Sequence, residues 1–167
     1  MTDPMAVRLR QFGSWRIPGQ QGSPARRAAA LLLRLACVAL LGWIGYIHLH
    51  LWLEGYRYIP TNGPLFLLDA IAGYGVAMAL LVWPAPLIGL LAIGYTTGTL
   101  GALLISLTVG LFGFHESIHA SYVTLSLVIE AITVLALASW TVLAAAPAGP
   151  FPPQARAPSP RRRVAPR

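Results

Sequence analysis

The sequence has few charged residues, no lysine and a single cysteine, and these scarcities exclude several classes of protein. Charged residues make up only 10% of the chain, far below the roughly 25% typical of soluble globular proteins. Because Cys37 is the only cysteine, the chain cannot form an internal disulfide or a cysteine-rich metal site. Neither a soluble globular domain nor a disulfide-stabilised one is expected.

Hydrophobic residues account for 56% of the 167 residues. Apolar runs of roughly 20 residues recur along the chain, which is the length that a helix needs to cross a bilayer. Within the third run, Gly94 and Gly98 are four residues apart, a spacing typical of close helix packing in membranes. We predict an all-α fold, a bundle of four transmembrane helices at about 28–50, 64–83, 87–111 and 120–143.

Both ends of the chain differ in composition from this transmembrane domain, 28–143. Residues 1–27 are polar, with several prolines, glycines and arginines, and 144–167 is rich in proline and arginine. Such compositions cannot bury enough apolar surface to form a core. We predict a disordered basic N-terminal arm and a disordered C-terminal tail.

The net charge of +7 comes from 12 arginines less 5 acidic residues. Eleven arginines lie at the two ends, and only Arg57 falls between the predicted helices. The positive-inside rule therefore predicts that both termini are cytoplasmic. The excess of arginine over acidic residues is thus explained by membrane topology and does not require a nucleic-acid partner. We expect contact with the lipid bilayer and no nucleic-acid partner. A membrane-protein partner or a homo-oligomer remains open.

All four histidines fall in the two segments predicted to face the extracytoplasmic side, together with two glutamates. Imidazole and carboxylate groups together suit zinc, copper or iron. One hypothesis is therefore a transition-metal or haem site on this face, and the alternative is interfacial histidines bonded to water or backbone. The candidate ligands are His48, His50, His115, His119, Glu54 and Glu116.

The segment His115-Glu116-Ser117-Ile118-His119 matches the HExxH pattern of zinc peptidases. On a helix, two histidines four residues apart share a face and can bind one zinc, while the glutamate activates a water molecule. A third ligand is normally needed. Glu130 lies roughly 16 Å further along the helix than His119, too far to bind the same metal, which leaves Asp69. A membrane-embedded zinc metallohydrolase with Glu116 as its catalytic residue is thus an alternative, and we expect no enzyme.

Asp69 and Glu130 are predicted to lie within the membrane, where a charge is costly, so each should face the bundle interior, be protonated or have a partner. Tyr122, Ser126, Glu130 and Thr133 follow helical spacing and form a polar stripe on the fourth helix. The stripe either joins helices or carries protons. A small proton- or ion-coupled transporter using Asp69 and Glu130 is the third hypothesis, and four helices would then need to oligomerise.

Several short segments carry a resemblance: Leu49 and Trp52, Gly55–Arg57, Ile59–Thr61, Gly63–Leu68 and Gly110–Glu116 (GLFGFHE). Through them the chain resembles small, functionally uncharacterised four-helix membrane proteins of actinobacteria, over about 28–143. The resemblance implies a multi-pass protein of the bacterial inner membrane and supplies no activity.

From the sequence, then, the expected function is that of a small, non-enzymatic integral membrane protein or accessory subunit. Its His/Glu-rich extracytoplasmic face would bind a metal, a cofactor or a partner.

Overall fold

The structure is a computed structural model that describes residues 23–146. Most of the predicted N-terminal arm and C-terminal tail therefore lies outside the described residues. The parts that are described, 24–27 and 144–145, differ from the prediction because they belong to helices.

The described chain forms four long helices and no named strand, which confirms the predicted all-α bundle. All four helices are long and apolar enough to cross a membrane. The shortest has 21 residues and, at a rise of 1.5 Å per residue, is about 30 Å long, the thickness of the hydrocarbon core. The elements are α2 Pro24–Glu54, the short 3-10 helix η1 Tyr56–Tyr58, α3 Asn62–Val82, α4 Pro86–Thr108 and α5 Val123–Ala145.

Local chemistry explains where α2 begins and ends. The Ser23 side chain accepts a hydrogen bond from the backbone nitrogen of Arg26, and Pro24 occupies the first turn, so the helix begins about one turn before the predicted start. At the other end, Gly55 has a φ of 136°, which ends the helix.

The predicted end of the third helix and start of the fourth were both wrong. α4 ends at Thr108 rather than 111, and α5 begins at Val123 rather than 120. Gly110 and Gly113 have φ values of 87° and 80°, a left-handed conformation that glycine adopts readily and that stops a helix. The connection 109–122 is therefore a long loop.

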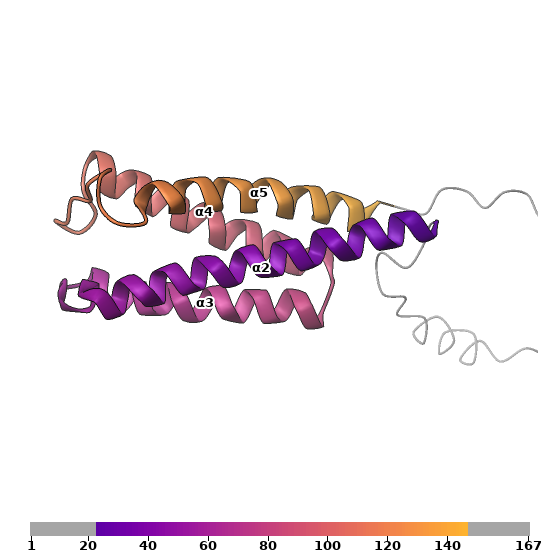
Figure 1. Cartoon of the computed structure of the whole chain (residues 1–167), viewed down its shortest axis with the longest axis horizontal. Helices are drawn as coiled ribbons and strands as arrows, with labels where there is room; N and C mark the ends of the chain where they lie inside the picture. The colour runs from indigo at the N-terminus through magenta and orange to yellow at the C-terminus, as the bar shows by residue number, and fades with distance from the viewer. Residues whose placement is uncertain (1–22, 147–167) are drawn as a thin grey trace, which may run out of the picture.

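The four helices run antiparallel in two pairs (Figure 1). α2 packs extensively against α3, and α4 against α5, while α2 also contacts α5. The contact between α3 and α4 is the least extensive of these. We call the end formed by 55–61 and 109–122 the loop end, and the end that holds Pro24, 83–85 and Ala145 the terminal end.

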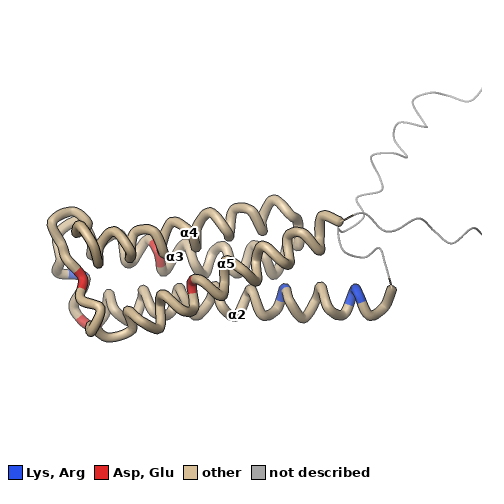
Figure 2. Tube along the Cα trace, turned by 90° about the horizontal axis from the view of Figure 1, so that it is seen from above, with Lys and Arg blue, Asp and Glu red and all other residues tan. Residues whose placement is uncertain are grey.

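Apart from Arg57, which lies at the loop end, the described basic and acidic residues are divided between the two halves of the bundle. Figure 2 shows the basic positions of α2 near the terminal end and the acidic positions in the half nearer the loop end. The guanidinium of Arg26 donates hydrogen bonds of 3.0 and 3.1 Å to the carbonyl oxygens of Leu143 and Ala146, which joins the start of α2 to the end of α5.

Small residues allow the paired helices to approach closely. Gly45 on α2 lies against Gly73 on α3, and a Cβ built on Gly73 would be 3.1 Å from the Gly45 Cα. On the other side, Gly89 on α4 contacts Thr141 on α5. Such contacts are typical of helices that associate inside a bilayer. The buried apolar core beside them includes Cys37, Leu41, Ala77, Leu80, Ala92, Leu137 and Trp140.

Large apolar side chains also cover the outside of the bundle. Leu135, for example, is 68% exposed, and exposed leucines, isoleucines and valines occur on all four helices. A surface of this kind would promote aggregation in water, whereas lipid tails solvate it. With four helices long enough to span a bilayer, the fold is that of a membrane protein.

Candidate functional site

The four helices surround a cavity of about 460 Å³ in the half of the bundle nearest the loop end. Small-molecule pockets usually measure roughly 300–1,000 Å³ and are mainly apolar with a few polar groups, as this one is. Its lining comes from all four helices and from the loop 109–122. The polar side chains in it are His48, Asn62, Asp69, Tyr95, Thr99, Ser106, Glu116, Ser126 and Glu130.

Glu130 of α5 is the most deeply buried charged residue of this lining. It is 1% exposed, and its Oε2 has no hydrogen-bond partner among the described residues. The hydroxyl of Thr99 on α4, which also lines the cavity, donates to the Thr96 carbonyl oxygen of its own helix at 2.9 Å. Buried polar atoms without a partner are rare because they lose their bonds to water without compensation. Glu130 therefore offers a cavity ligand one free oxygen.

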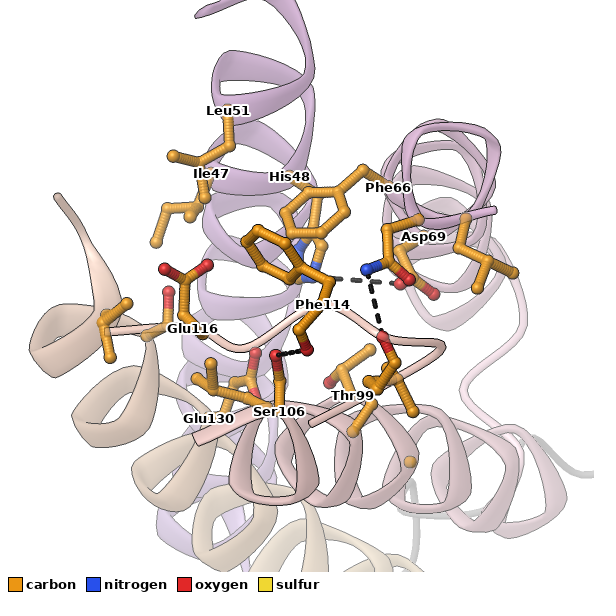
Figure 3. Close-up of a pocket in the computed structure, with 18 of the residues that line it drawn as sticks. Ile47, His48, Leu51, Phe66, Asp69, Thr99, Ser106, Phe114, Glu116 and Glu130 are labelled. Carbon is orange, nitrogen blue, oxygen red and sulfur yellow. Dashed lines mark hydrogen bonds and ion pairs between the residues drawn. The ribbon is translucent and has the colours of Figure 1, made fainter. Parts of the chain in front are cut away.

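His48 of α2 and Asp69 of α3 form a second polar group in the cavity (Figure 3). The Nδ1 of His48 lies 2.9 Å from the carbonyl oxygen of Ile44, which can only accept a hydrogen bond. Nδ1 therefore carries a proton, and Nε2 faces the Asp69 carboxyl with 3.9 Å between Nε2 and Oδ2. The centroid of the Phe66 ring lies 5.4 Å from that of the His48 imidazole, and this packing holds the orientation of the imidazole.

The loop 109–122 closes the loop end of the cavity. Ser106, at the end of α4, holds the loop through two bonds: its carbonyl accepts from the Glu116 backbone nitrogen at 3.1 Å, and its hydroxyl donates to the Phe114 carbonyl at 3.5 Å. The Asn62 side chain donates to the Leu111 carbonyl at 3.4 Å. These bonds place Phe114 and Glu116 in the cavity lining, as Figure 3 shows.

One hydrogen bond joins the two segments of the loop end. The Tyr56 hydroxyl donates to Oε2 of Glu116 over 2.8 Å. Burial raises the pKa of Tyr56, and the hydrogen bond to Glu116 and the charge of that carboxylate raise it further. The phenol therefore stays protonated, and remains a donor, at pH values that ionise an exposed tyrosine.

We expect Tyr56→Phe to lower the free energy of unfolding by about 1 to 2 kcal/mol, because it leaves the half-buried Glu116 without this donor. A detergent-unfolding titration in micelles measures the change. The pKa of Tyr56 is higher in the folded than in the unfolded state. The stability that Tyr56 contributes is therefore complete below pH 10.0, the ordinary pKa of tyrosine, and declines as the pH rises above that value. Tyr58→Phe is the control, since Tyr58 is 75% exposed. If both variants lowered the free energy of unfolding equally, the hydrogen bond from Tyr56 to Glu116 would not be what joins the two segments.

The four histidines do not come together. His48 faces the cavity, whereas His50 pairs with Glu54 on the same helix, with 3.1 Å between Nε2 and Oε1, and stacks on Tyr46. His115 and His119 are exposed in the loop 109–122. In residues 23–146 no group of three or more histidine, cysteine, aspartate or glutamate side chains could hold a metal ion. The structure therefore lends no support to the transition-metal or haem site, which stays a prediction.

The HExxH segment lies in the loop and not on a helix. Its two imidazoles therefore lack the helical spacing that a zinc peptidase uses to place both ligands on one face. Glu116 instead accepts hydrogen bonds from Tyr56 and from the backbone nitrogen of Ser117. Nothing in this geometry favours the metallohydrolase.

The polar stripe of α5 faces inward. Ser126, Glu130 and Thr133 are buried, and the first two line the cavity. Tyr122, just before the helix, is half-buried with its ring 5.1 Å from that of His50. Ser126 and Glu130 of the stripe thus line the same cavity as Asp69, which lies on α3.

Sequence reasoning missed several lining residues. Tyr95, Ala102 and Ser106 were not singled out, and together with Thr99 they recur every three or four positions and form one face of α4. This periodicity was visible in the sequence but did not show that the face borders a cavity. Asn62 gave no comparable signal.

A scan against models of protein families, a search among curated proteins and a search among solved structures each found no match for the chain.

Proposed function

We propose that this chain is a small, non-enzymatic membrane protein that binds a small, largely apolar molecule in the cavity between its four helices. The observation that carries the proposal is the cavity itself, which combines an apolar lining with a few polar groups at one end of the bundle. Small-molecule sites commonly form between the helices of a bundle. The deeply buried Glu130, with one oxygen that has no partner in residues 23–146, adds a group that a ligand would satisfy.

The ligand enters from the lipid side, between α3 and α4. These two helices make the least extensive contact of the packed pairs. Gly94 and Gly98 of α4 line the cavity and are exposed, and a Cβ built on either would meet no atom of the described part of the chain within 4 Å. These glycines therefore leave a gap instead of packing against another helix of this chain. The loop 109–122 closes the other route, so an apolar ligand would come from the bilayer.

The proposal also places the protein in the bacterial plasma membrane, with both termini in the cytoplasm. It is supported by the eleven arginines at the two ends of the chain against Arg57 alone between the helices. The loop end, with its histidines and glutamates, then faces the extracytoplasmic side.

Filling the gap at Gly98 tests the proposal. We expect 1-tert-butyl-4-fluorobenzene to give a protein-bound ¹⁹F NMR signal with the purified protein in micelles. Gly98→Leu should weaken its binding about tenfold or more, because the leucine side chain occupies the cavity mouth.

Gly75→Leu provides the matched control. Gly75 is also exposed on a transmembrane helix and has nothing within 4 Å of a built Cβ, but it does not line the cavity. This variant should bind the probe as the unchanged protein does. If the two leucine variants bind equally well, or if the unchanged protein gives no bound signal, the cavity is not a binding site for apolar molecules.

A further inference from the structure

The cavity lining is acidic. Three carboxyl groups, from Asp69, Glu116 and Glu130, line it together with one imidazole, from His48. Among the described residues, 23–146, no arginine side chain lines the cavity, and the chain has no lysine. A ligand that reaches this site thus meets several acceptors with negative or potentially negative charge, and no fixed positive charge.

The acids lie on different sides of the cavity. Glu130 projects from α5, whereas Asp69 projects from α3 beside His48, and Figure 3 shows them on opposite sides. In residues 23–146 these carboxyls do not form a group of three that could hold a metal ion. Their separation fits a body larger than a bare ion, which would lie between them.

Aromatic rings occupy the loop-end part of the lining. Phe66, Phe112 and Phe114 contribute to it, and Tyr95 adds a ring deeper in the bundle, where its hydroxyl donates to the Asp69 carbonyl oxygen. Tyr56 supports two of these rings, with centroid distances of 4.7 Å to Phe66 and 6.0 Å to Phe114. The faces of aromatic rings attract cations, and such rings combined with carboxylates are the usual recognition elements for ammonium groups.

We propose that the cavity binds an organic monocation, an ammonium group that carries an aryl or alkyl substituent. Its charge lies near Glu130, whose Oε2 has no partner among the described residues, and its apolar part lies against the aromatic rings. This inference rests on the proposed function, because it assumes that the cavity binds small molecules. Binding is non-covalent and needs no co-reactant.

Three ¹⁹F probes of similar size separate charge from shape: (4-fluorophenyl)trimethylammonium, its neutral isostere 1-tert-butyl-4-fluorobenzene, and 4-fluorobenzenesulfonate. With the full chain in micelles of a neutral detergent, we expect the cation to bind about tenfold tighter than the isostere. The sulfonate should give no bound signal.

Glu130→Gln keeps the shape of the side chain and removes its charge. It should lower the ratio of the cation affinity to the isostere affinity about tenfold, and an unchanged circular-dichroism spectrum and melting profile show that the variant is folded. The control is Glu54→Gln, because Glu54 is half-exposed, pairs with His50 and does not line the cavity. That variant should keep the full preference for the cation.

The possible failures are distinguishable. If the unchanged protein binds the neutral isostere as tightly as the cation, the cation proposal is overturned while the cavity remains a binding site. The same holds if Glu130→Gln retains the full preference for the cation, because the charge would then be recognised elsewhere. If none of the three probes binds, the proposed function fails together with this inference.

Discussion

Gly89→Ala is expected to lower the free energy of unfolding by about 3 kcal/mol, the upper end of the range for overpacking a tight contact. The new Cβ would collide with the Thr141 hydroxyl and lie 3.0 Å from a ring carbon of Trp140. Because Thr141 and Trp140 are both buried on α5, neither can move away without separating α4 from α5. Unfolding in a detergent titration measures the loss.

Two variants test the cause. Gly94→Ala lies on the same helix with open space around it, and its effect should stay within about 0.5 kcal/mol. Adding Thr141→Ala to Gly89→Ala should restore most of the loss, because it removes the colliding hydroxyl, which has no hydrogen-bond partner in the described part of the chain. If Gly89→Ala is as mild as Gly94→Ala, the close packing of α4 on α5 is wrong.

The second large effect is an all-or-none difference in topology. Alkaline phosphatase fused after Gly63 or after Ser117 should be active, because Ser117 lies in the loop end proposed to be extracytoplasmic and Gly63 lies next to it, in the first turn of α3. The enzyme fused after Pro150 should be inactive, as expected for a cytoplasmic position. The physical reason is the retention of arginine-rich segments on the cytoplasmic side, where eleven of the twelve arginines would lie.

A fusion after Ala85 adds an internal control. Ala85 lies in the short connection between α3 and α4 at the terminal end, so this fusion should be inactive in cells and a fluorescent-protein fusion there should fluoresce. Activity after Ala85 together with inactivity after Gly63 would reverse the proposed orientation.

The transmembrane helices were predictable because each is a long apolar run with few charges, and hydrocarbon admits little else. The errors lie at the ends of these runs. Apolar Val109 and Leu111 continue the pattern of the third run, so the sequence predicts a helix as far as 111. Gly110 and Gly113 instead adopt positive φ values, and the pair was the available signal for an earlier end.

The grouping of the candidate residues was less predictable than their identity. Histidines were grouped by type, but His48 and His50 point in different directions from α2, and His48 lies beside Asp69 on α3. That contact depends on which helices are neighbours and at which depth, and a single sequence does not specify either. Gly94 and Gly98 show the same limit, since their spacing predicts close packing and they border the cavity instead.

Photolabelling tests most directly whether the cavity is a binding site. The probe is a neutral tert-butylphenyl trifluoromethyl diazirine, applied to the full chain in lipid vesicles, with labelled residues identified by mass spectrometry. The account predicts labelling of cavity residues such as Thr99, Ser126 and Glu130, and loss of that labelling with excess 1-tert-butyl-4-fluorobenzene. Labelling confined to outward-facing residues such as Leu87 and Leu135, and unchanged by the competitor, would contradict it.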